Sequence, residues 1–137
     1  MIPWCHANGT GVIVYSPMMS GLLTQRFSAE RARNLDPSDW RHGMPDVFAE
    51  PALSRNLALR DALIPIADAH GTSTAAVSVA WALAWTGVTG AIVGARDAAQ
   101  VDGWIGAHEV HLSGADLDAI AAAIGATGAG GGPARPV

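Results

Sequence analysis

Hydrophobic residues along the chain gather in two short continuous runs, which are separated by stretches with helical spacing. The first run, residues 11–15, reads Gly-Val-Ile-Val-Tyr, and the second, residues 91–93, reads Ala-Ile-Val. Each run follows a glycine-bearing turn and is too short for a helix, and β-branched side chains favour extended backbone. The pattern therefore predicts two short buried strands.

Three stretches between and after these runs predict helices. Residues 53–70 place apolar side chains at helical spacing and end in a His-Gly pair typical of a glycine C-cap, while Pro65 predicts a kink or a restart. Residues 74–85 follow a capping Ser73 and are apolar on nearly every side, which predicts a buried helix. A third helix is expected at residues 98–107.

The ends of the chain and its longest polar segment complete the pattern. Residues 2–7 resemble the last turn of a helix, and Ser113 begins a final helix with Asp116 in the capping-box position. The polar residues 24–51 are punctuated by prolines and predict a loop that is either a functional lid or disordered. Residues 125–137 are rich in Gly and Pro, which predicts a frayed tail.

Strands that alternate with helices indicate parallel pairing in βα units, so an α/β fold is expected for a domain at residues 1–124. Two strands with buried faces do not make a stable parallel sheet alone, because each leaves an edge and a face uncovered. The pattern therefore predicts that these elements are part of a larger sheet.

Composition and charge narrow the function classes. The chain has 137 residues, one domain on size grounds, and a formal net charge of −4, which argues against a nucleic-acid binder. No apolar run is long enough to span a membrane, so no membrane partner is expected. The single cysteine, Cys5, excludes an intrachain disulfide and fits a reducing, cytoplasmic location. The histidines show no metal-ligand spacing, and no metal site is predicted.

Several short motifs stand in order along the chain. They are Tyr15-Ser16-Pro17, Gly21-Leu22-Leu23, His70-Gly71, Val79-Ala80-Trp81, and Ile92-Val93-Gly94-Ala95-Arg96 followed by Gln100. Taken together, with fitting spacing over nearly the whole chain, they resemble the carboxyl-terminal portion of the aldo-keto reductases. Any one of these pieces alone would be a weak signal.

This resemblance implies the fold of NADP-dependent carbonyl reductases, a (β/α)8 TIM barrel of roughly 250 residues. The chain matches about the last two βα units and the terminal helix, so the barrel is expected to be incomplete. The family's catalytic Asp, Tyr, Lys and His come from earlier strands and have no match here, and the chain has no lysine at all. No catalytic residue is therefore predicted, and the chain alone is expected to be inactive.

Two alternatives to the cofactor-binding part of an oxidoreductase stay open. In the first alternative, the chain is a non-catalytic nucleotide-binding module. It would fold beside a separately supplied amino-terminal half or by self-association through its open strand edges. A carbonyl substrate is expected only where such a half completes the barrel. The other alternative is a truncated product without an independent role.

The resemblance assigns a cofactor cradle to the segment after the first strand. Barrel sites form at the carboxyl ends of strands, and Tyr15 at such an end would stack on the nicotinamide of NADP(H). The alternative is a tyrosine that closes the strand in the core. The loop that lines the cofactor and its pyrophosphate is matched by Ser16, Pro17, Met18 and Gly21. Methionine is also a common packing residue.

Arg96 follows the second strand, after Gly94 and Ala95, where a glycine lets the backbone approach a ligand closely. Its guanidinium and the free amides that open the next helix predict an anion site. The resemblance identifies the anion as the 2′-phosphate of NADP. The alternative is a surface ion pair with Asp97 or Asp102.

Three further side chains complete the predicted cofactor site. Arg26 is either a phosphate contact or a solvated surface arginine. Gln100 matches a position that reaches the adenosine end of the cofactor. Trp104 stands where relatives frequently carry an asparagine that bonds adenine, so this indole either stacks on adenine or packs in the core.

Overall fold

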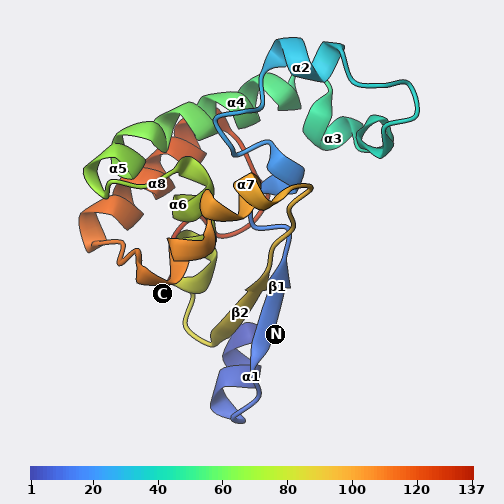
Figure 1. Ribbon diagram of the computed structural model, residues 1–137. Coiled ribbons are helices and arrows are strands. Elements are labelled where there is room, and N and C mark those ends of the chain that lie inside the picture. Colours follow the sequence, from blue (N-terminus) through green and yellow to red (C-terminus); the bar gives the residue numbers. More distant parts are fainter.

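The structure, a computed structural model that describes residues 1–137, is built from two strands and a series of helices. In Figure 1 the strands lie side by side and project from the helical part of the molecule, with α1 at their amino ends. The elements, where η marks a 3-10 helix, are α1 (Ile2–Ala7), β1 (Val12–Tyr15), η1 (Met19–Gly21), α2 (Ala29–Arg33), η2 (Trp40–Gly43), α3 (Pro45–Phe48), α4 (Ala52–Ala62), α5 (Ile64–Ala69), α6 (Thr74–Leu83), β2 (Val88–Ile92), α7 (Ala98–Asp102), η3 (Ile105–Glu109) and α8 (Gly114–Thr127).

The sheet is parallel, as the alternation of strands and helices predicts. β1 pairs with β2 in a register that places Val14 opposite Ala91 and Tyr15 opposite Ile92. Because the strands run in the same direction, their carboxyl ends lie at the same end of the sheet. The segments that follow Tyr15 and Ile92 therefore start beside one another.

The expectation that both strands are buried is wrong for this structure. Ile13, Tyr15 and Ile92 are 65%, 81% and 61% exposed. Ala91 and Val93 pack against the buried cluster around α6, whereas no layer covers the opposite face. The sheet consists of β1 and β2 alone, so no closed barrel forms. β-branched side chains favour extended backbone, but burial on both faces needs a second layer of structure.

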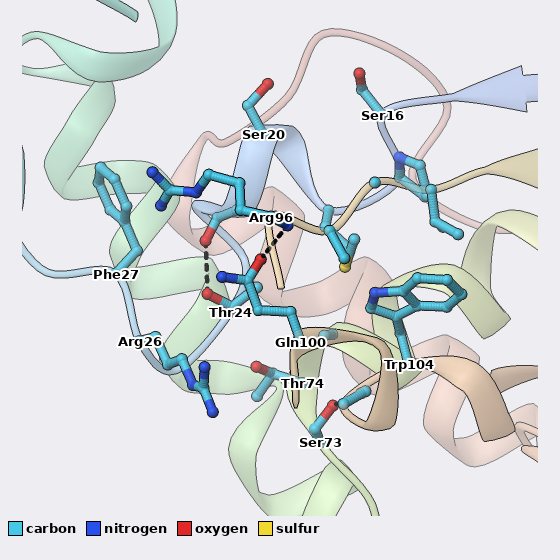
Figure 2. Close-up of a pocket in the computed structure, with 18 of the residues that line it drawn as sticks. Ser16, Ser20, Thr24, Arg26, Phe27, Ser73, Thr74, Arg96, Gln100 and Trp104 are labelled. Atoms are coloured by element: carbon cyan, nitrogen blue, oxygen red, sulfur yellow. Dashed lines mark hydrogen bonds between the residues drawn. The ribbon is translucent and has the colours of Figure 1, made fainter. Parts of the chain in front are cut away.

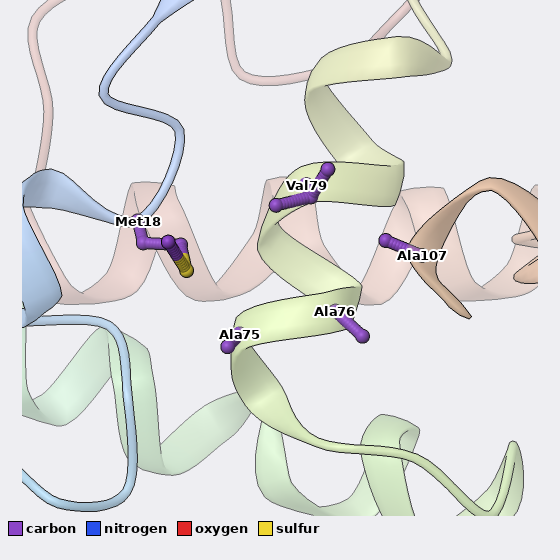
Figure 3. Close-up of a cluster of buried hydrophobic side chains, with 5 residues drawn as sticks. All are labelled: Met18, Ala75, Ala76, Val79 and Ala107. Atoms are coloured by element: carbon purple, nitrogen blue, oxygen red, sulfur yellow. The ribbon is translucent and has the colours of Figure 1, made fainter. Parts of the chain in front are cut away.

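Helix α6 is the centre of the core, and nearly all of its side chains are buried, as its apolar sequence predicts. Figure 3 shows Ala75, Ala76 and Val79 of α6 between Met18, from the segment after β1, and Ala107 of η3. Two other clusters connect α6 with α5 and α8, and α4 with the segment after β1. They consist of Leu63, Ile66, Ala67, Val77 and Ile120, and of Leu22, Phe27 and Leu53.

The predicted restart at Pro65 is confirmed. α4 ends at Ala62 and α5 begins at Ile64, so Pro65 lies in the first turn of α5. A proline is accommodated there because the amides of a first turn have no intrahelical partner.

None of the helices combines the length and the apolar character that a membrane span requires.

Two sequence expectations about loops and helices need correction. Residues 24–51 are not a continuous loop, because α2, η2 and α3 form within them, two of these capped by Ser28 and Asp39. The helix expected at 98–107 is interrupted between α7 and η3. Trp104 has a non-helical φ of −143°, and the Ser73 hydroxyl donates a hydrogen bond to the carbonyl oxygen of Gly103 at the interruption.

The fraying expected from residue 125 is also corrected. Helix α8 continues past this point to Thr127 and is capped by Gly128, whose φ of +66° suits a glycine. In the tail, Val137 accepts a hydrogen bond from the amide of Thr86 at 3.0 Å, and Arg135 pairs with Asp118 at 2.6 Å. These contacts, which are distant in sequence, hold the tail against the helical part of the molecule.

The predicted capping box is present at the start of α8. Ser113 Oγ accepts from the amide of Asp116 at 3.2 Å, and the Asp116 carboxylate accepts from the Ser113 amide and hydroxyl at 2.8 and 2.7 Å. His70 Nε2 lies 3.1 Å from the same carboxylate. The hydrogen bonds from Ser113, and then the one with His70, lower the pKa of Asp116.

We expect Asp116→Asn to lower the free energy of unfolding by about 1 kcal/mol at neutral pH, the usual loss for one side-chain hydrogen bond. Because the pKa of Asp116 is lower in the folded state, its stabilisation is complete above the ordinary value of 3.8 and is lost as pH falls through the folded value. Urea unfolding at neutral and at acidic pH measures both effects. Asp68→Asn, at an exposed carboxylate without a side-chain hydrogen bond, is the control. A variant that keeps the wild-type acid sensitivity would contradict the role of Asp116.

Candidate functional site

A cavity of about 840 Å³ lies beyond the carboxyl ends of β1 and β2. Its walls come from the segment after β1, the first turn of α6 and the turn after β2, which Figure 2 shows, and from the loop that carries η2. All eleven residues that the sequence analysis assigned to cofactor binding line it: Tyr15, Ser16, Pro17, Met18, Gly21, Arg26, Gly94, Ala95, Arg96, Gln100 and Trp104. The fold thus brings two distant segments to one cavity, and their roles toward a cofactor stay predictions.

The segment after β1 has an unusual backbone conformation. Ser16, Met19 and Ser20 have φ values of 54°, 47° and 57°, and Gly21 has 90°. For a residue with a Cβ, a left-handed conformation costs on the order of 1–3 kcal/mol and persists only where its surroundings enforce it. Backbone strain of this kind concentrates at ligand-binding segments.

Buried contacts enforce this conformation. Leu22 is fully buried, Thr74 of α6 donates a hydrogen bond to the carbonyl oxygen of Leu23 at 2.8 Å, and Thr24 donates to the carbonyl oxygen of Gly21 at 2.7 Å (Figure 2). The hydroxyls of Ser16 and Ser20 line the cavity and have no hydrogen-bond partner. Ser20 was not predicted, although it lies between the two motifs that identified its neighbours.

Arg96 lines the cavity from the turn after β2 and forms no ion pair. The alternative of a surface pair with Asp97 or Asp102 is therefore wrong. Asp97 caps α7 instead: its carboxylate accepts hydrogen bonds from the backbone and the side-chain amide of Gln100 at 3.0 and 2.9 Å. The Arg96 guanidinium is left without an anionic partner.

The free amides expected where α7 opens at Ala98 stay a prediction, and two amides beside them are occupied. The Gln100 amide is occupied by Asp97, and the Arg96 amide donates to Gln100 Oε1 at 3.0 Å (Figure 2). With five residues, α7 also contributes only a small dipole. Gln100 thus holds the backbone of Arg96, and its contact with adenosine stays a prediction.

Arg26 and Arg31 place two further cations on the cavity wall. Both are exposed, neither forms an ion pair, and the Arg31 guanidinium lies 3.4 Å from the carbonyl oxygen of Arg26. Figure 2 shows the guanidinium groups of Arg26 and Arg96 on one side of the pocket and Trp104 on the other. Arg31 was not predicted, because its local sequence does not distinguish it from Arg33 on the same helix.

The aromatic residues of the cavity behave differently from one another. Tyr15 is 81% exposed and lines the cavity, so the alternative of a core tyrosine is wrong. The ring of Trp104 packs against the cluster of Met18 and α6, as one of its two alternatives predicts. Its Nε1 atom is buried without a hydrogen-bond partner, and Figure 2 shows this atom on the ring edge that faces the other pocket residues.

One wall of the cavity, residues 39–41, was missed. Arg41 is buried; its Nε and Nη2 atoms donate to the Asp39 carboxylate at 2.8 and 2.6 Å, and its guanidinium lies 5.6 Å from the centre of the Phe27 ring. The hydrogen bond from the Arg41 side chain holds the pKa of Asp39 far below its ordinary value. The sequence Asp36-Pro37-Ser38-Asp39-Trp40 is typical of a helix start or a turn, but it does not predict the place of this segment beside the strands.

The histidines lie away from this cavity, and none of them lines it. No group of three or more His, Cys, Asp or Glu side chains lies close enough together to hold a metal ion.

Comparisons with known proteins agree with the fold. The Aldo/keto reductase family matches residues 1–124 of the chain. Among solved structures, the chain is similar to the glycerol dehydrogenase AKR11B4 from Gluconobacter oxydans, with a TM-score of 0.80 and 25% sequence identity. The match covers 93% of this chain and 38% of that chain, so this chain spans well under half the length of its structural relative. Since the family match extends over nearly all of its elements, the chain belongs to the aldo/keto reductase family.

Proposed function

We propose that this chain binds NADP(H) in the cavity beyond β1 and β2, as the cofactor-binding part of a carbonyl-reducing oxidoreductase. One observation carries the proposal: Arg96, a cation without an anionic partner, lines the same cavity as the exposed ring of Tyr15. A guanidinium binds a phosphate monoester through two parallel hydrogen bonds, which suits the 2′-phosphate that distinguishes NADP from NAD.

The local charge supports an anionic ligand. The chain as a whole carries a net charge of −4, yet Arg26, Arg31 and Arg96 line one cavity without ion pairs. Unpaired cations repel one another in a shared space, and a bound di- or polyanion relieves that repulsion. A dinucleotide with a diphosphate and a 2′-phosphate supplies the required charge.

The size and the polar groups of the cavity also fit this cofactor. Its volume of about 840 Å³ lies within the range of small-molecule and cofactor sites, ~300–1,000 Å³. The Ser16 and Ser20 hydroxyls line the cavity and are donors without partners. A hydroxyl without a protein partner can donate a hydrogen bond to a phosphate or ribose oxygen of the cofactor.

Bound nicotinamide would supply the hydride for the interconversion of a carbonyl and an alcohol, the class of chemistry to which a glycerol dehydrogenase belongs. In this proposal Tyr15 orients the nicotinamide ring, and the arginines hold the phosphates. We assign no catalytic residue within residues 1–137, so the chain is proposed to hold the cofactor and not to reduce a carbonyl alone.

Titration of the chain with NADPH and with NADH tests this proposal. We expect saturable quenching of tryptophan fluorescence by NADPH, and an affinity for NADH that is at least tenfold lower, because NADH lacks the phosphate that Arg96 binds. A tenfold difference corresponds to about 1.4 kcal/mol, below the value of one charge-assisted hydrogen bond. Equal affinities would contradict the phosphate site, and the absence of saturable binding would contradict the cofactor site as a whole.

A further inference from the structure

Trp40 has an unusual position for a large aromatic residue. Its side chain is 62% exposed at the start of η2, and it lines the cavity beyond the strands. Leaving an indole in water forgoes the stabilisation that its burial would give. An exposed aromatic ring on a cavity wall is therefore a candidate surface for a flat, apolar part of a ligand.

The loop around Trp40 is held rigidly on both sides of the indole. Before it, the Asp36 carboxylate accepts hydrogen bonds from the Ser38 amide and hydroxyl at 2.8 and 2.5 Å. After it, Arg41 is buried over the Phe27 ring and bonded by two nitrogens to Asp39. The loop therefore keeps Trp40 at the wall without packing the ring itself.

Few aromatic rings in the cavity are free to stack on a ligand. Phe27 is buried beneath Arg41, and the ring of Trp104 packs against the cluster around α6. Only Tyr15 and Trp40 present exposed rings to the cavity. NADP(H) carries two flat ring systems, nicotinamide and adenine, and Tyr15 is assigned to the first.

We propose that Trp40 stacks on the adenine ring of the dinucleotide, the role that the sequence pattern offered to Trp104. This inference rests on the proposed function, because it presupposes that the cavity binds NADP(H). The Asp39–Arg41 pair positions the indole, and Arg26 and Arg31 supply positive charge in the same cavity. An indole can stack on any nucleobase. Trp40 therefore contributes affinity for the adenosine half of the cofactor but does not select adenine over other bases.

The test uses isothermal titration calorimetry with three probes: NADPH, adenosine 2′,5′-bisphosphate and reduced nicotinamide mononucleotide. We expect Trp40→Ala to weaken binding of the first two by about tenfold, in keeping with base stacking measured by alanine substitution, and to leave the third unchanged. Trp40→Phe, which keeps an aromatic face, should retain most of the affinity. Trp4→Ala is the matched control, because Trp4 is 66% exposed and lies outside the cavity.

The outcomes separate this inference from the proposed function. If the wild-type chain binds NADPH and Trp40→Ala binds adenosine 2′,5′-bisphosphate with unchanged affinity, the stacking role is overturned and the cofactor site stands. If Trp40→Ala loses as much affinity for reduced nicotinamide mononucleotide as for adenosine 2′,5′-bisphosphate, the stacking role is also overturned. Equal losses would show that the substitution distorts the whole cavity. A wild-type chain that binds none of the three probes would overturn the proposed function, and this inference with it.

Discussion

Arg96→Ala is expected to weaken NADPH binding by about 100-fold and to change NADH binding little. Arg96 carries no ion pair, so the substitution removes a cation without releasing an acidic partner elsewhere. Hydrogen bonds to a charged group contribute ~1.5–3 kcal/mol each, and 100-fold corresponds to about 2.7 kcal/mol. Calorimetric titration of the variant with both cofactors measures the change in preference.

Arg33→Ala is the matched control for this substitution. Arg33 is an exposed arginine at the end of α2 that does not line the cavity, so its removal changes the net charge equally. A similar loss of NADPH affinity in both variants would show that the effect is long-range electrostatics rather than a contact. Equal losses for NADPH and NADH in Arg96→Ala would exclude the 2′-phosphate as the group that Arg96 binds.

Leu22→Ala is expected to lower the free energy of unfolding by about 2–5 kcal/mol, the range for a leucine removed from a packed core. Leu22 is fully buried and packs with Phe27 and Leu53. It directly follows Gly21 and the strained residue Ser20, so its anchoring also holds the cavity wall after β1. Urea unfolding followed by circular dichroism measures the loss, and NADPH titration at a temperature where the variant is folded measures the effect on the site.

Leu59→Ala serves as the control, because Leu59 is a half-buried leucine of α4 outside the three buried clusters. We expect a smaller loss of stability there and no change in NADPH affinity. A Leu22 variant as stable as the Leu59 variant would contradict the assignment of Leu22 as the anchor of the wall.

The sequence predicted much of the local structure because its signals act over a few residues. The capping residues Ser73 and Ser113, and the restart at Pro65, depend on hydrogen bonds and sterics within one turn of helix, and all are found in the structure. The helix at 98–107 was predicted as continuous and is interrupted at Trp104. Its ring packs against α6, a contact that helical spacing alone does not encode.

The candidate site also combines residues that local sequence signals predict with residues that only contacts between distant segments place there. Tyr15 and Arg96 could be placed on one cavity from sequence, because parallel strands end at the same edge of a sheet and the motifs mark both strand ends. Arg31 and Trp40 could not, because they reach the cavity through the fold of residues 24–51. That fold depends on the burial of Arg41 over Phe27 and of Leu22 against Leu53, contacts between distant residues.

The sequence by itself determined the order of the elements, the parallel direction of the strands and the chemistry available at their carboxyl ends. Only the tertiary structure decided which arginines remain unpaired, which aromatic rings stay exposed, and that one face of the strands lies open. The physical reason is range: caps, turns and backbone preferences act between neighbours along the chain. Burial and ion pairing depend on which distant segments the packing around α6 brings together.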